Sequence, residues 1–129
     1  MRKFLALVAF LLFGLLASAQ SDNIFYGRAQ ELYVGFSDGE KINWLEDPAY
    51  VDILIEIKGN KITIYSRDIQ EYHVIGLLYE DEKSAKWYCS DEDGIKCHFY
   101  MAPYGLREER IGIIVEYSDM AWSYICVPE

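Results

Sequence analysis

Strict alternation of polar and apolar side chains is the feature that most constrains this chain. Residues 51–57 read Val-Asp-Ile-Leu-Ile-Glu-Ile, so four branched apolar side chains share one face of an extended segment and two acids lie on the other. Residues 61–65 resume the alternation after a break containing Gly59 and Asn60, and the two runs therefore predict a β-hairpin. A period of two residues does not fit a helix.

Similar short runs, separated by turn residues, continue along most of the sequence. They predict strands at residues 31–36, 41–45, 71–79, 86–90, 95–101, 111–117 and 121–127. Gly76 interrupts one of these runs and predicts a β-bulge. The sequence contains no convincing amphipathic helix, so the expected class is all-β.

Antiparallel strands joined by hairpins must protect their edges, either by closing into a barrel or by stacking as two sheets. We expect an antiparallel meander of about seven to nine short strands, closed as a small β-barrel or packed as a β-sandwich, with the barrel preferred. The expected core comprises Phe36, Ile53, Ile55, Ile57, Ile62, Ile64, Phe99 and Ile113. The barrel resembles lipocalins in architecture only: the Gly-x-Trp signature of their first strand is missing here, because Ser37 follows Gly35-Phe36.

The first 19 residues have the pattern of a cleavable secretory signal peptide. Arg2 and Lys3 precede an apolar run over residues 4–16, and Ala17-Ser18-Ala19 supplies small residues for cleavage before Gln20. As a helix the apolar run would span about 20 Å, which is shorter than the roughly 30 Å hydrocarbon core of a bilayer. The sequence thus predicts a single all-β domain over residues 20–129, secreted or periplasmic, with no membrane insertion after cleavage.

The charge balance limits the classes of partner. The chain carries 12 Lys and Arg residues against 21 Asp and Glu residues, for a net charge of −9, and removal of Arg2 and Lys3 with the leader would make it more negative. Such a protein repels phosphate backbones, so nucleic acid is not an expected partner.

Three cysteines suggest a disulfide in an exported domain. If residues 92–94 form a three-residue hairpin loop, Cys89 lies directly opposite Cys97 at a distance that a disulfide can span. The alternative pairing joins Cys97 to Cys126. We expect the remaining cysteine to be buried and to pack as a small hydrophobic side chain. The alternative is a reactive cysteine or one that pairs with another chain.

The sequence contains few motifs that would indicate a metal-binding or catalytic site. Asp91-x-Asp93-Gly94 begins like a calcium loop, but no Glu follows at the spacing that an EF-hand requires. His73 and His98 lack the spacing of a zinc motif. Without a nucleophile elbow or a phosphate-binding loop, the sequence predicts a non-enzymatic protein without metal or cofactor, while a weak calcium site in an acidic turn and a small secreted hydrolase stay as minor alternatives.

Aromatic side chains are the most abundant resource for binding, at 16% of the sequence. We expect a ligand or partner surface that includes Tyr88, Tyr100, Trp122 and Tyr124, because tyrosine and tryptophan combine an apolar ring with a polar tip. Two functions fit. One is a protein-interaction or inhibitor-type module for an extracytoplasmic protein, and the other is a β-barrel that binds a small apolar molecule or a sugar. The sequence leaves the oligomeric state open.

Overall fold

The computed structural model describes residues 24–38, 40–105, 107 and 109–129, so the predicted leader lies outside the described residues. The described residues form β-strands and no helix. The strands are β1 (Ile24–Ser37), β2 (Ile42–Trp44), β3 (Ala49–Lys58), β4 (Lys61–Ile64), β5 (Gln70–Glu80), β6 (Ala85–Asp91), β7 (Lys96–Tyr104), β8 (Arg110–Glu116) and β9 (Met120–Pro128). This confirms the expected all-β class. No helix long and apolar enough to cross a bilayer occurs in this part of the chain.

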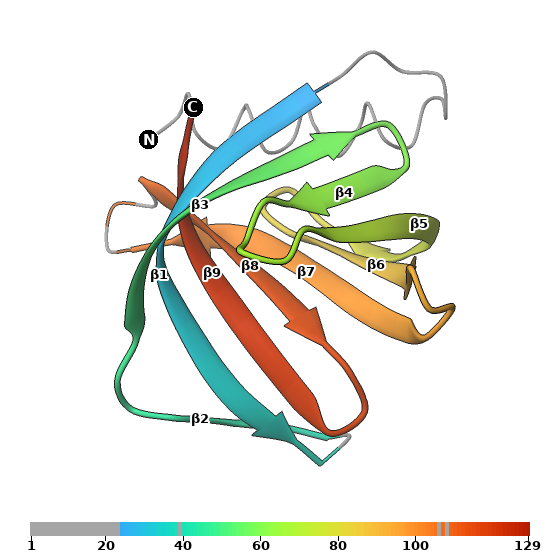
Figure 1. Cartoon of the computed structure of the whole chain (residues 1–129), viewed down its shortest axis with the longest axis horizontal. Coiled ribbons are helices and arrows are strands. Elements are labelled where there is room, and N and C mark those ends of the chain that lie inside the picture. The colour runs from blue at the N-terminus through green and yellow to red at the C-terminus, as the bar shows by residue number, and fades with distance from the viewer. Residues whose placement is uncertain (1–23, 39, 106, 108) are drawn as a thin grey trace.

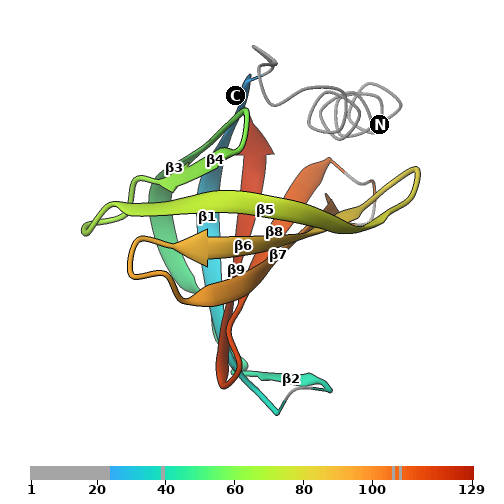
Figure 2. The same ribbon diagram turned by 90° about the vertical axis from the view of Figure 1, so that its right-hand side faces the viewer.

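The strands close into a barrel (Figures 1 and 2). From β3 to β9 each strand pairs antiparallel with the next, and β1 pairs with both β3 and β9. The seam between β1 and β9 extends from Gly27–Pro128 to Phe36–Met120. Because this seam joins the two ends of the sheet, the chain forms a barrel of eight strands plus the short β2, and the sandwich alternative is wrong.

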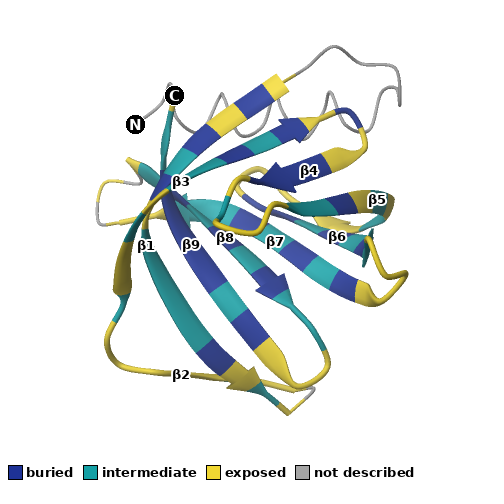
Figure 3. Cartoon of the chain, in the orientation of Figure 1, coloured by how far each residue is buried: buried dark blue, intermediate teal, exposed yellow. Residues whose placement is uncertain are grey.

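Inward-facing side chains fill the barrel with one continuous hydrophobic cluster. Buried residues alternate with more exposed ones along several strands (Figure 3). Its large buried members include Phe25, Ile55, Ile57, Ile62, Ile64, Tyr72, Trp87, Phe99, Met101, Ile111, Ile113 and Tyr124. The expected core residues are therefore in place with one exception. Phe36 is wrong as a core residue, because it pairs with Asn43 and Met120 at the far end of the seam and remains 54% exposed.

Turns and bulges occur where the sequence predicted them. Gly94 has a φ of 80° in the hairpin between β6 and β7, which is the left-handed conformation that this loop requires. In β5 the pairing with β6 shifts register between Val74 and Gly76, and it shifts again between Leu77 and Tyr79. The first shift confirms the bulge expected at Gly76.

The cysteines are close in the predicted way but are not bonded. Cys89 lies opposite Cys97 across the β6–β7 hairpin, as the loop length implied. All three cysteines are nevertheless free and buried, so the disulfide prediction is wrong for either pairing. Burial raises the pKa of Cys89 to about 12, of Cys97 to about 11 and of Cys126 to about 12. The thiols are therefore protonated at neutral pH and pack as small apolar side chains.

Candidate functional site

The candidate site lies on the outside of the barrel, where β1, β9, β8 and β7 run side by side. Strand pairing places one row of outward-facing residues across these four strands: Tyr33, Ser123, Ile114 and Tyr100. The next row consists of Glu31, Ile125, Gly112 and Ala102. In the first row, two tyrosine side chains stand on β1 and β7 with smaller side chains between them. In the second row, β7 and β8 carry only Ala102 and Gly112, and a channel lies over these small residues.

The channel is a groove of about 520 Å³ with aromatic walls. Its lining comprises Tyr33, Trp44, Leu45, Glu46, Tyr100, Ala102, Pro103, Tyr104, Gly112, Ile114, Ser123 and Ile125, and we refer to it as the outer groove. Ile125 is only 2% exposed although it faces away from the barrel interior. The part of the floor on β9 is thus as buried as the core, while Ala102, Gly112 and Ile114 are half-buried.

One wall exists because the strand beside β1 is broken. Strands β2 and β3 both run antiparallel to β1. Strand β3 pairs with the part of β1 from Ile24 to Leu32, and β2 pairs with its last residues, from Gly35 to Ser37. The chain between them leaves the sheet after the hydrogen bond of 2.9 Å from Leu45 N to Val34 O. This interruption brings Trp44, Leu45 and Glu46 to the groove.

Gly35 permits the close approach of β2 to β1. A Cβ atom at Gly35 would lie 2.7 Å from Cγ2 of Ile42 and 2.8 Å from Cε3 of Trp44, closer than real Cβ contacts. Since the missing side chain leaves this space to the indole ring, Gly35 helps to place Trp44 at the groove.

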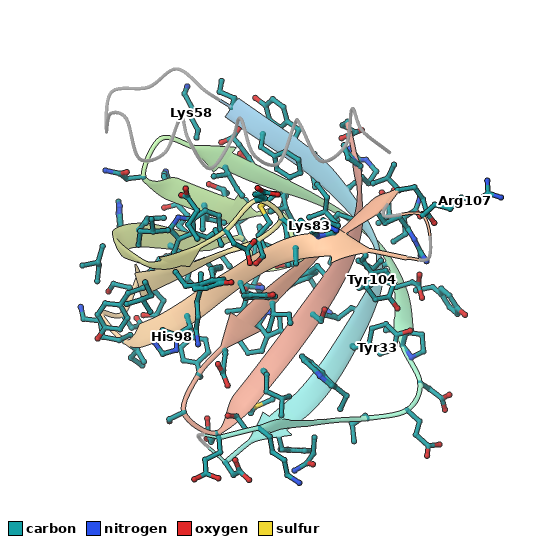
Figure 4. All side chains as sticks on the ribbon, turned by 180° about the vertical axis from the view of Figure 1, so that it is seen from behind. Tyr33, Lys58, Lys83, His98, Tyr104 and Arg107 are labelled. Atoms are coloured by element: carbon teal, nitrogen blue, oxygen red, sulfur yellow. The ribbon has the colours of Figure 1, made fainter. Side chains whose placement is uncertain are left out.

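The tyrosines at the other edge of the groove are held by a charged cluster. Nη1 of Arg110 lies 2.7 Å from Oε2 of Glu31, and its guanidinium stands 5.1 Å from the centre of the Tyr104 ring. The hydroxyl of Tyr33 donates to Oε1 of Glu31 at 3.5 Å. Figure 4 shows Tyr33 and Tyr104 beside each other at this edge. Partial burial, together with Tyr104 and Glu31, raises the pKa of Tyr33, so its hydroxyl remains a donor at neutral pH.

A second aromatic group lies at the mouth of the barrel. Tyr117 stacks on Trp122 with 5.5 Å between ring centres, and its hydroxyl donates to Oδ2 of Asp91 at 2.8 Å. Asp91 also accepts hydrogen bonds from the backbone N–H groups of Asp93 and Ile95. These contacts close the β6–β7 turn, and we interpret the group as structural.

The structure separates the four aromatic residues that the sequence pointed to. Tyr100 lines the outer groove, and Tyr88 lines another hollow of about 270 Å³ beside His98. Trp122 faces a hollow of about 330 Å³ at the barrel mouth. Tyr124 is 2% exposed and belongs to the core. The alternation in β9 was predicted, but it turns Trp122 and Tyr124 inward, so these four residues do not form one surface.

Sequence reasoning missed three aromatic residues of the outer groove: Tyr33, Trp44 and Tyr104. They belong to β1, β2 and β7; β1 and β2 pair locally, whereas β7 comes near them only when the barrel closes through β8 and β9. Trp44 next to the Glu-Asp-Pro segment was the available signal, because proline often marks an interruption of a strand.

Among the described residues, no group of three or more His, Cys, Asp or Glu side chains is arranged to hold a metal ion. Comparison with known proteins gave no match to this chain among family models, curated proteins or solved structures.

Proposed function

We propose that this protein is an exported, non-enzymatic interaction module that binds a segment of an extracytoplasmic protein in its outer groove. The observation that carries the proposal is the groove itself, an aromatic hollow of about 520 Å³ on the outside of a barrel whose interior is filled. Export rests on the leader pattern in residues 1–19.

The position of the groove favours a macromolecular partner. Side chains that line the barrel pack against one another, so a ligand would have to displace core residues such as Phe99 or Ile55 to enter. The outer groove requires no such displacement, and its tyrosine and tryptophan side chains are of the types enriched where proteins meet.

Net charge indicates which proteins would associate fastest. The chain carries a charge of −9, and Glu46 is the one charged residue among the described residues that line the groove. Complementary charge speeds the encounter of two proteins. The partner segment is therefore expected to be basic.

A small ligand is the second candidate, because about 520 Å³ is within the range of small-molecule sites. Native mass spectrometry of the purified protein separates the two. We expect the mass of the unliganded chain. A specific adduct that disappears on denaturation would favour the small-ligand function.

Site-specific photocrosslinking tests the protein-interaction proposal directly. A benzophenone amino acid is placed at Tyr104 in the groove or at Tyr26, which is equally exposed at 38% but does not line it. In the native host we expect one discrete crosslinked product from position 104 and none from position 26. The product should also disappear when Gly112→Val fills the groove floor. Identical products from both positions, or none from position 104, would refute the proposal.

A further inference from the structure

We infer that the outer groove recognises a proline-rich segment in the polyproline II conformation, carrying a basic residue beside its prolines. This inference rests on the proposed function and adds the chemistry of the partner. It comes from three properties of the groove: its flat aromatic walls, the kind of polar atoms at its edge, and the charge beside Trp44.

Flat apolar walls suit proline rings. Tyr33, Trp44, Tyr100 and Tyr104 surround a floor in which Ala102, Gly112 and Ile114 offer no polar side-chain atom. Proline-rich segments bind in grooves lined by aromatic residues, and their extended conformation exists before binding, so little entropy is lost. Gly112 leaves room at the centre, because a Cβ there would have no neighbour closer than 3.8 Å.

The edge of the groove carries side chains that can donate hydrogen bonds. A polyproline II segment has no internal hydrogen bonds, and prolines lack the N–H group, so the segment presents carbonyl oxygens that need donors. The hydroxyls of Tyr100 and Tyr104 and the indole N–H of Trp44 can donate to such oxygens, whereas the hydroxyl of Tyr33 already donates to Glu31. A sugar presents many hydroxyls that both donate and accept, whereas Ser123 is the one polar side chain on the floor among the described residues.

Strand pairing is not available over most of the floor of the groove. Strands β8 and β9, which form this part of the floor, are paired on both sides, so their backbone groups are already used. A peptide lying over them is recognised through side chains, as polyproline II segments are.

The negative charge of Glu46 makes one end of the groove different from the other. It lies at the end of the groove that Trp44 and Leu45 form, while the opposite edge carries Arg110 already paired with Glu31. An arginine or lysine beside the prolines would therefore be attracted to the Glu46 end. This asymmetry predicts one preferred orientation of the bound segment.

The test is titration of the purified protein with a synthetic peptide of roughly ten residues, mostly proline with one terminal arginine, followed by calorimetry. A peptide with alanine in place of each proline and a linear glucose oligosaccharide are the comparison ligands. We expect saturable binding of the proline peptide and at least about tenfold weaker binding of the other two. Equal binding of the proline and alanine peptides, or tighter binding of the oligosaccharide, would overturn the inference.

Variants locate the site. Trp44→Ala and Gly112→Val should each weaken binding of the proline peptide by about tenfold or more, and the second variant removes no aromatic ring. Tyr26→Ala is the control and should bind as the unchanged protein does. Glu46→Gln should weaken binding only when the peptide carries arginine. Binding that survives both groove variants would place the peptide elsewhere and refute the inference.

The two proposals can fail separately. If the proline peptide does not bind but the crosslink from position 104 is still formed, the groove is a protein-docking site for another kind of segment. If both are absent, the proposed function fails as well.

Discussion

Two phenylalanines show how position in the barrel decides what a side chain contributes. Phe99 is 1% exposed and meets Tyr72 edge to face with 4.7 Å between ring centres, whereas Phe36 is 54% exposed. Phe99→Ala should lower the free energy of unfolding by about 3–5 kcal/mol, because it leaves a cavity in a packed interior. Phe36→Ala should change it by less than about 1 kcal/mol. Urea denaturation of both variants measures the difference, and equal effects would contradict the assignment of the core.

Asp81 links one turn to the pH dependence of stability. Its carboxylate accepts hydrogen bonds from the hydroxyl of Tyr79 and from the N–H groups of Lys83 and Ser84, both at 2.8 Å. These contacts, with that from Tyr79 the largest, lower the pKa of Asp81 to about 2. A lowered pKa stabilises the folded state above the unfolded value of about 3.9, and this contribution is lost as pH falls toward the folded value.

Asp81→Asn should therefore have a lower free energy of unfolding than the unchanged protein at neutral pH. This difference in stability should become smaller between about pH 4 and about pH 2. Denaturation midpoints measured across this range check the prediction. Asp119→Asn, in the exposed β8–β9 turn, controls for the loss of one negative charge. A difference in stability that does not change with pH would show that Asp81 does not act through its ionised form.

Residue-level predictions from the sequence succeeded where alternation alone decides burial. Ile53, Ile55 and Ile57 face inward as their spacing indicated. Phe36 has the same alternation, but β1 outruns the barrel at that point, and no local pattern records where the neighbouring strands end. The cysteines illustrate a second limit, since the register of a hairpin sets the distance between Cys89 and Cys97 but does not set their oxidation state.

Alanine substitutions of two glycines, one at the bulge in β5 and one in the β6–β7 turn, should change the stability in opposite directions. At Gly76 in β5, an added Cβ would meet nothing within 4 Å, and the backbone has no positive φ. Gly76→Ala should stabilise the protein by about 0.4–1 kcal/mol, because it restricts the unfolded chain. Gly94→Ala has equal space but a φ of 80°, so it should destabilise the fold by about 1 kcal/mol. Thermal denaturation compares the two, and changes of the same sign would disprove the role given to backbone conformation.

The existence of the strands could be predicted better than the residues at which they begin and end. Every expected strand exists, because hairpins with short turns repeat the same local signals. The sequence underestimated β1, which begins at Ile24, and it gave no sign that β2 and β3 share one side of β1. The break between them follows the hydrogen bond from Leu45 N to Val34 O, and a single contact of this kind leaves no periodic pattern in the sequence.

Net charge belongs to the whole molecule, and it predicts a salt dependence. With a charge of −9 the protein should attract the arginine-bearing proline peptide over distances of about a Debye length, roughly 10 Å at 0.1 M salt. Raising the salt concentration from about 0.05 to about 0.5 M should lower the association rate constant by about tenfold and alter the dissociation rate constant much less. Stopped-flow fluorescence measures both rates. The same peptide without arginine is the control, and an equal salt effect on it would contradict steering by charge.

The candidate site was the part of the molecule that was hardest to predict from the sequence, because it forms only when the barrel closes. Tyr100 was identified from its strand, but Tyr33 reaches the groove only because β1 pairs with β9, and Tyr104 only because β7 pairs with β8. Periodicity tells which residues share a face of one strand. It does not tell which strands become neighbours around a barrel.

The seam between β1 and β9 also sets an order of events in time. Arg28 and Glu129, whose side chains meet at 3.0 Å, are separated by 101 residues. Pairings this distant slow folding, and barrels of this kind fold in about milliseconds to seconds. A nascent chain emerges from its N-terminus, so β1 lacks one of its two neighbours until β9 has been synthesised. Since Tyr33 meets Ser123 across that seam, the outer groove forms only after β9 has joined β1, and a chain that still lacks β9 has no site with which to capture a partner.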